Sequence, residues 1–262
     1  MQKGVTIRCE SLATNGIDYA WRMGLFGFLG VTYTPAREEH EEAGRFIPLR
    51  RITTSQELRD FLASVATLLH RPEHAQAVQY SLSETIRNVL EHAGGSPAYA
   101  CAQYYPKPRR VSIGVADCGI GIRRSLERYY NLQSDGEALL EAMRPGITGA
   151  PRGIYGTVDN AGAGLFFTKS IAKSSHEYFA IYSGTAAYRL RRVAKSEDFR
   201  LYLDPRHDRH DFFEALPRWA GTVVGLDMGI RRLASFEITM SLIRDAYASG
   251  RKKKVAIKVR FR

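Results

Sequence analysis

The chain has 262 residues, which suffices for one substantial domain with additions or for two small domains. Hydrophobic residues make up 44% and charged residues 25%, as is usual for a protein that folds around an apolar core. No apolar run approaches the ~20 residues that a membrane helix requires, so no membrane partner is expected. Three widely spaced cysteines indicate a reducing, cytoplasmic environment and argue against structural disulfides or a cysteine-rich zinc site.

Basic residues outnumber acidic ones by 38 to 27, a formal net charge of +11. Such an excess favours polyanionic partners such as nucleotides, nucleic acid or acidic proteins, although a solvated basic surface explains it as well. Part of the excess lies in residues 251–262, RKKKVAIKVRFR, where apolar and basic residues alternate. This period of two predicts a strand with one buried and one cationic face, either a protected sheet edge or a nucleic-acid contact.

Three parts of the chain are expected. Residues 1–50 form an N-terminal extension, residues 51–230 the main domain, and residues 231–262 a basic C-terminal tail of helix and strand. Within the extension, WRMGLFGFLGV is short, contains three glycines and precedes no small-residue cleavage site. We interpret it as a buried segment rather than a signal peptide. The strand-like RFIPLRRI then leads into the main domain.

Two amphipathic helices are predicted next. Thr54 or Ser55 caps the first, SQELRDFLASVATLL, whose leucine, phenylalanine and valine residues share one face. Pro72 interrupts the helical pattern. The second helix runs from about Glu73 to His92 and stops at a pair of glycines.

Strands dominate the rest of the main domain: AYACAQYY, RRVSIGVAD, HEYFAIYS, AAYRLRRV and AGTVVGLDM. A glycine-rich stretch over residues 119–164 holds one helix at about 134–144, and LFFTKSIAK forms another helix. Glycine-rich loops of this length are typical of lids or disordered segments. The order of elements predicts an α/β fold, a two-layer sandwich of a mixed, mostly antiparallel sheet with helices on one face.

Polar residues recur every four positions along the second helix, in YSLSETIRNVLEHAGG. Glu84, Asn88 and His92 therefore lie on one stripe, opposite the apolar residues that pack on the sheet. The Asn88 carbonyl could complete the shell of a Mg²⁺ that retains waters and phosphate oxygens. Glu84 could orient or deprotonate a water near a γ-phosphate. A solvated polar face is the alternative explanation for the same pattern.

A carboxylate at a strand end forms the second candidate feature, in VSIGVADCGIGI. Asp117 is followed by Gly119 and Gly121, so the carboxylate lies beside backbone without side chains. A carboxylate is the acceptor that suits the exocyclic amine of adenine. A dinucleotide fingerprint, G-x-G-x-x-G, does not fit, because its third glycine position is Arg124.

Two glycines open the later helix of NAGAGLFFTKSIAK. Gly162 and Gly164 leave the first amides of this helix accessible, and its positive dipole end favours an anion. Lys169 and Lys173 lie on the same helix. Contact between Lys169 and phosphate is one interpretation, and a position beside the sheet is the other.

Two weaker signals complete the set. Thr222 follows a glycine at the start of a hydrophobic strand, where its hydroxyl could contact phosphate. The segment DPRHDRHDFF brings aspartates and histidines close together, as a metal site would, but without a further spaced ligand pair a polar loop is favoured.

The order and spacing of these pieces resemble the GHKL superfamily, which includes DNA gyrase, heat-shock chaperone ATPases and sensor histidine kinases. ETIRNVLEHA is similar to its asparagine box, DCGIG and GAGLFFTKSI to its two glycine boxes, and GTVVGLDM to its closing Gly-Thr strand. The resemblance implies the ATP-binding Bergerat fold, Mg²⁺ on Asn88, adenine on Asp117 and Glu84 as the base. The remaining pocket residues that it implies are His92, Gly119, Gly121, Gly162, Gly164, Leu165, Lys169 and Thr222.

The function implied is that of a cytoplasmic, stand-alone Mg-ATP-binding regulator with slow ATP hydrolysis, acting on a protein partner or as a homodimer. A serine protein kinase of the anti-sigma type is an alternative, although Glu91 stands where those kinases often carry a basic residue. A second alternative is a nucleic-acid-binding module that ATP switches, with the basic C-terminus as its contact.

Overall fold

A computed structural model describes residues 16–32, 45–69, 72–147, 162–192, 200–230, 236–252 and 257–258. Its centre is a seven-stranded sheet in which every neighbouring pair is antiparallel. The strand order is β1 (Phe46–Ile52), β2 (Ala98–Tyr105), β3 (Arg110–Ala116), β8 (Trp219–Gly229), β4 (Phe179–Gly184), β5 (Ala186–Leu190) and β7 (His210–Phe213).

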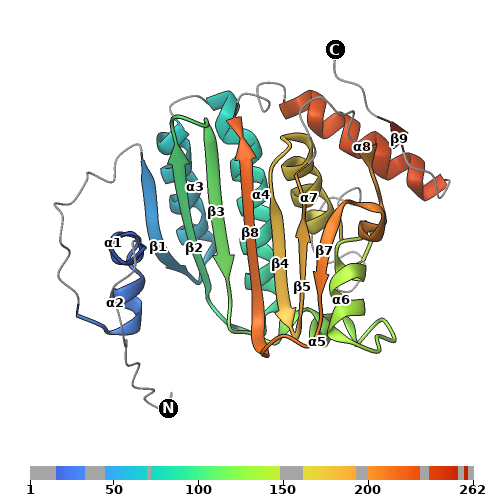
Figure 1. Cartoon of the computed structure of the whole chain (residues 1–262), viewed down its shortest axis with the longest axis horizontal. Helices are drawn as coiled ribbons and strands as arrows, with labels where there is room; N and C mark the ends of the chain where they lie inside the picture. Colours follow the sequence, from blue (N-terminus) through green and yellow to red (C-terminus); the bar gives the residue numbers. More distant parts are fainter. Residues whose placement is uncertain are drawn as a thin grey trace.

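The larger helices cover one face of this sheet, behind the strands in Figure 1. They are α3 (Ser55–Leu69), α4 (Pro72–His92) and α7 (Gly164–Ser174), and α8 (Phe236–Lys252) packs against α4 and α7. At one end of the sheet lie α5 (Gly121–Leu126) and α6 (Asp135–Ala142). This arrangement confirms the predicted two-layer α/β sandwich.

Buried apolar residues alternate with more exposed residues along the strands, and the buried ones form the core. In β3, Val111, Ile113 and Val115 are buried under the helices, while the residues between them face the opposite side. The antiparallel register sets Ile113 beside Leu226 of β8, so apolar side chains from neighbouring strands meet in one layer. Complete burial of each such side chain contributes about 1.5–3 kcal/mol.

Both predicted long helices are confirmed, with local reasons for where they begin. Ahead of α3, the Glu57 carboxylate accepts hydrogen bonds from the backbone N–H groups of Thr53 and Thr54, and the Thr54 hydroxyl accepts one from Glu57 N (3.2 Å). This reciprocal pair is a capping box. Pro72 begins α4 because its fixed φ suits a first helical position and its missing N–H costs nothing there.

The interpretation of WRMGLFGFLGV as a buried segment is only partly right. The stretch holds the end of a short helix, α1 (Ile17–Arg22), and the whole of a second, α2 (Leu25–Leu29). Met23 and Phe26 are buried, but Leu25 and Phe28 are exposed. The two helices contact the sheet face opposite the other helices, where Phe28 packs edge-on against Tyr99 of β2 (ring centroids 5.6 Å apart).

The described part of the glycine-rich stretch holds two helices where one was predicted, because α5 precedes α6. Residues 148–161 of this stretch lie outside the described residues. Of the predicted C-terminal strand, the described part is β9 (Ile257–Lys258), which pairs with β6 (Arg200–Leu201). The division expected at residues 50 and 230 does not coincide with a packing boundary, since β1 crosses the first position and α8 shares the main core.

None of the described helices is long and apolar enough to cross a membrane.

Candidate functional site

The polar stripe of α4 is present as predicted. Glu84, Asn88 and His92 are all partly exposed, whereas Leu82 and Ile86 on the other side of the helix are completely buried. The helix thus uses its apolar side to fix itself on the sheet and holds its polar stripe in a defined direction.

The first turn of α7 lies directly against this stripe. A Cβ added to Gly164 would come within 2.7 Å of Glu84 Oε2 and 3.6 Å of Asn88 Nδ2, so a side chain here would displace the carboxylate. Phe167 N–H donates to the carbonyl of the N-cap residue Ala163 (2.9 Å), and the N–H groups before Phe167 have no acceptor within the helix. Ala163, at the N-cap, has no side-chain group that could accept from them.

The backbone conformation of Gly162 allows the first turn of α7 to lie this close to α4. Its φ of 74° lies in the left-handed region, and a Cβ there would come within 2.8 Å of Ile147 O. Leu165, on the first turn, is partly buried against the core and anchors the start of α7. Both residues therefore determine where the first amides of α7 lie.

Asp117 ends β3 with its carboxylate held by two backbone donors. Gly119 N–H donates to Oδ1 (2.7 Å) and Thr222 N–H donates to Oδ2 (3.1 Å), and the residue is 2% exposed. Each carboxylate oxygen retains a second acceptor position. A Cβ on Gly221 would overlap this carboxylate, so the close approach of the two strands requires glycine there.

The Asp117 loop rests on the C-terminal end of α4. Ile120 N–H donates to Ala93 O (3.3 Å), and a Cβ on Gly119 would overlap the same carbonyl. Cys118 N–H donates to Ser96 Oγ (3.2 Å). Thus α4 carries Glu84 and Asn88 along its length and supports the Asp117 loop at its end, which joins the two groups of predicted residues into one region.

Ser183 belongs to this region and was not predicted. The side chain is buried, donates to Gly221 O (2.8 Å), lies 3.3 Å from Thr222 Oγ1 and accepts from Ile122 N–H (3.0 Å). Gly121, with φ of 76°, brings the start of α5 to this hydroxyl. No motif surrounds Ser183, and its role depends on β4 pairing with β8, which the sequence does not reveal.

Lys169 lies elsewhere. It is 1% exposed and forms an ion pair with Asp208, which also pairs with Lys173. The prediction that Lys169 contacts phosphate is therefore replaced by the alternative position beside the sheet. The reason is that the segment ending at Asp208 folds back against α7 and brings the Asp208 carboxylate to the two lysines.

The segment DPRHDRHDFF, predicted as a polar loop, contains a short 3-10 helix and the edge strand β7, and its aspartates form ion pairs. Asp208 serves the two lysines, Asp211 pairs with Arg189 and Arg191, and Asp204 pairs with Arg206. Among the described residues, no cluster of three or more histidine, cysteine, aspartate or glutamate side chains could hold a metal ion.

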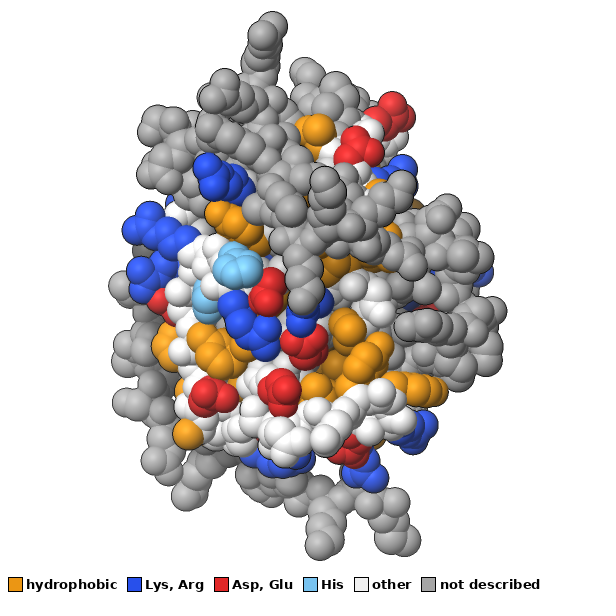
Figure 2. Space-filling view, turned by 90° about the vertical axis from the view of Figure 1, so that its right-hand side faces the viewer, with side chains coloured by type: hydrophobic (Ala, Val, Ile, Leu, Met, Phe, Trp, Pro, Cys, Tyr) orange, Lys and Arg blue, Asp and Glu red, His pale blue; other side chains and the backbone are white. Residues whose placement is uncertain are grey.

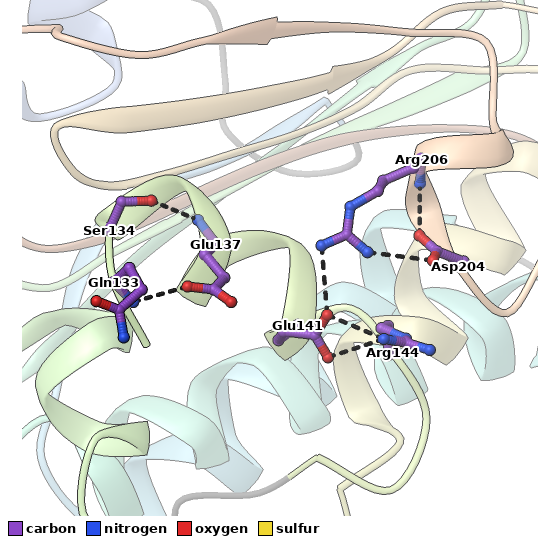
Figure 3. A network of polar contacts seen from close by, with 7 residues as sticks. All are labelled: Gln133, Ser134, Glu137, Glu141, Arg144, Asp204 and Arg206. Carbon is purple, nitrogen blue, oxygen red and sulfur yellow. Dashed lines mark hydrogen bonds and ion pairs between the residues drawn. The ribbon is translucent and has the colours of Figure 1, made fainter. Parts of the chain in front are cut away.

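Helix α6 is fixed at both ends beside the region. At its start, Asp135 Oδ2 accepts from Thr185 N–H and from the Thr185 hydroxyl (both 3.0 Å). At its end, Glu141 pairs with Arg144 and with Arg206 of the short 3-10 helix η1 (Pro205–His207), as Figure 3 shows. The described part of the glycine-rich stretch is therefore anchored to the sheet.

Burial shifts the pKa values of three side chains at the site. It raises the pKa of Glu84, against the opposing effect of Arg87, and it raises the pKa of Asp117 against the two backbone hydrogen bonds. Burial also lowers the pKa of His92, which favours its neutral form. A raised pKa makes the Glu84 carboxylate a stronger base than an exposed glutamate.

Comparison of the chain with models of known protein families and with curated proteins gives no match.

Proposed function

We propose that this chain binds Mg-ATP between α4, the Asp117 loop and the first turn of α7, as the resemblance to the GHKL superfamily implies. The observation that carries the proposal is the close approach of Gly164 to Glu84 and Asn88. It sets the first amides of a helix, which have no acceptor within the helix and suit phosphate, beside a carboxamide and a carboxylate, which suit a hydrated cation and a water.

The donor set fits magnesium bound to a nucleotide. A metal that keeps several waters and phosphate oxygens needs few protein ligands, and Asn88 offers one oxygen on the partly exposed stripe. Bound Mg²⁺ would supply neutralisation of phosphate charge. Glu84, one helical turn away, is the residue that would orient or deprotonate the attacking water.

Asp117 is the proposed adenine ligand. Its buried carboxylate is already oriented by Gly119 and Thr222, and each oxygen can accept one more hydrogen bond. Gly121 and Ser183 hold the adjoining backbone. The base would enter beside this loop, so that its amine reaches the remaining acceptor position.

The proposed role is an ATP-dependent regulator in the cytoplasm, with slow hydrolysis and with a protein partner or a second copy of the chain. The serine-kinase alternative gains no support from Glu91, which pairs with Arg87 (3.4 Å) and places an acid where those kinases carry a base.

Titration calorimetry with Mg-ATP tests the proposal on the full chain. Gly164→Ala places a methyl group against the Glu84 carboxylate, so we expect affinity to fall at least roughly ten-fold, the equivalent of about 1.4 kcal/mol. Gly225→Ala is the matched control, because a Cβ at Gly225 meets no atom within 4 Å. Absence of Mg-ATP binding by the parent chain, or equal affinities of the two variants, would contradict the proposal.

A further inference from the structure

Arginines gather on the sheet face opposite α4 and α7, at the edge formed by β5 and β7. Arg189 pairs in register with Asp211, and Arg191 N–H donates to Arg209 O (2.9 Å), so Arg191 and Arg209 lie opposite one another just past the paired ends of β5 and β7. Seen from the β7 side in Figure 2, basic side chains gather at the upper left, where this face of the sheet is viewed edge-on.

Asp211 orients two guanidinium groups without covering them. Its Oδ2 accepts from Arg189 Nε (2.9 Å) and Nη2 (2.6 Å), and its Oδ1 accepts from Arg191 Nε (2.6 Å) and Nη2. Each guanidinium has five N–H donors. The donors on one edge, at Nε and Nη2, bind the aspartate, and the donors on the other edges remain available for a ligand. The two arginine side chains remain 55% and 51% exposed.

Asp211 stays ionised over a wide pH range and so holds the arginines in place. Hydrogen bonds from Arg191 and Arg189 hold the pKa of Asp211 at about 2, so this carboxylate stays ionised and keeps the guanidinium groups in place. Together with Arg192, which pairs with Glu177, four arginines face two acids, an excess of two positive charges. An excess of oriented arginines is suited to phosphate.

Two exposed aromatic rings lie among these arginines. Phe213 pairs in register with Ala187 and is 41% exposed, with the Arg189 guanidinium 5.9 Å from its ring centre. Tyr178 directly precedes β4 and is 42% exposed, with the Arg192 guanidinium 4.5 Å from its ring centre. Exposed rings on a flat sheet face are the platforms on which unpaired bases stack.

We propose that this arginine–aromatic patch, made of Arg189, Arg191, Arg192, Arg209, Tyr178 and Phe213, binds single-stranded nucleic acid. The guanidinium groups contact phosphates, and the two rings stack with bases. Two separated rings set among arginines favour this occupant over a membrane, and stacking favours a single strand over a duplex, whose bases are already stacked. The patch lies on the opposite face from the nucleotide region, so the proposal stands independently of ATP binding.

Fluorescence anisotropy on the full chain tests the patch, with a labelled mixed-sequence single strand of roughly 20 nucleotides. We expect affinity to fall as salt rises, because contacts with phosphates release counterions. Arg189→Gln combined with Arg191→Gln should lower affinity at least roughly ten-fold and flatten the salt dependence. Phe213→Ala should lower affinity roughly five- to hundred-fold and leave the salt dependence unchanged, since the ring contributes stacking.

The control is Arg59→Gln, which removes an exposed arginine of α3 that also holds a neighbouring side chain, Gln56, but lies on the other layer. This variant should bind as the parent does. Each variant is also checked for its thermal midpoint and for Mg-ATP affinity, both of which should be retained. Equal binding of the duplex or of phosphatidylserine vesicles, no binding of the single strand at low salt, or unchanged affinity of the patch variants would overturn the proposal.

Discussion

The first turn of α7 and the middle of the same helix handle charge in opposite ways. The first turn, whose amides have no acceptor within the helix, lies against Glu84 and Asn88 on a side that remains partly exposed. The middle of the helix buries Lys169 and Lys173 around Asp208, with Tyr188 also within hydrogen-bonding distance of that carboxylate (3.5 Å). A basic residue near a glycine-rich turn is therefore not necessarily a phosphate ligand. The side of the helix from which its side chain projects decides what it contacts.

The largest expected effect lies on the buried side. Asp208→Asn leaves two buried ammonium groups without their carboxylate, so the free energy of unfolding should fall by about 3–5 kcal/mol, as measured by urea denaturation. Burial already lowers the pKa of Lys173, which shows how costly its charge is there. Asp211→Asn, which removes ion pairs to two arginines whose side chains are about half exposed, is the control and should lower stability by less than Asp208→Asn does.

If the two aspartate variants unfold at the same urea concentration, the buried cluster contributes no more than a surface pair. The contrast between the two parts of α7 would then be unfounded.

Beside the first turn of α7, substitutions of Asn88 and Glu84 should have different effects. Asn88→Ala should abolish magnesium-dependent nucleotide affinity, because a small octahedral cation tolerates loss of a ligand poorly. Glu84→Ala should leave binding intact, yet slow any phosphate release by roughly 10²–10⁴-fold, the usual contribution of a positioned base. Calorimetry and a phosphate-release assay on both variants separate the two roles. Unchanged phosphate release by Glu84→Ala would remove it as the catalytic residue and favour an ATP-dependent switch.

Base selectivity gives a smaller effect. Asp117→Asn should weaken ATP binding by roughly ten- to hundred-fold, since a hydrogen bond to a charged group contributes about 1.5–3 kcal/mol. Guanine would present an acceptor to the same carboxylate, so GTP should bind more weakly to the parent chain. Equal calorimetric affinities for ATP and GTP would exclude Asp117 as the adenine ligand.

The pH dependence of stability sharpens the same assignment. Because burial raises the pKa of Asp117 in the folded state, its ionisation opposes folding. Its stabilising contribution is therefore complete below the ordinary aspartate pKa and is lost as pH rises through the raised value. The difference in unfolding free energy between the parent and Asp117→Asn should decrease over that window. A difference that stays constant with pH would indicate that the pKa of Asp117 is the same in the folded and unfolded states.

Local patterns predicted most of the fold. The period of four in α4, the capping residues before α3 and the alternation in β3 and β8 depend on neighbours in sequence, and all four elements are where the sequence predicts them. The two short helices α1 and α2 were missed because six and five residues are too few to show a helical period, and α2 also contains a glycine and lies between two others. Pairings between distant segments could not be predicted, because the sequence contains no information on strand order.

The candidate site divides in the same way. Glu84, Asn88, Asp117 and the glycines stand in local motifs, so their positions could be proposed from spacing. Lys169 could not be assigned, since its partner Asp208 lies 39 residues later in the chain. Ser183 was missed for the same reason, as its contacts with Ile122 and Thr222 depend on the pairing of β4 with β8.

The smallest expected effect is that of Ser183→Ala. The change removes an acceptor from Ile122 N–H and a donor from Gly221 O, so the free energy of unfolding should fall by about 1–3 kcal/mol if water does not replace these bonds. Because Gly221 and Thr222 adjoin Asp117, ATP affinity should fall a few-fold, with no change in the rate of phosphate release from bound ATP. Ser170→Ala is the control, since Ser170 is equally buried but lies on α7. If Ser183→Ala lowers stability while ATP affinity stays at the parent value, Ser183 supports the fold alone, and the Asp117 loop is positioned by Gly119 and Thr222 without it.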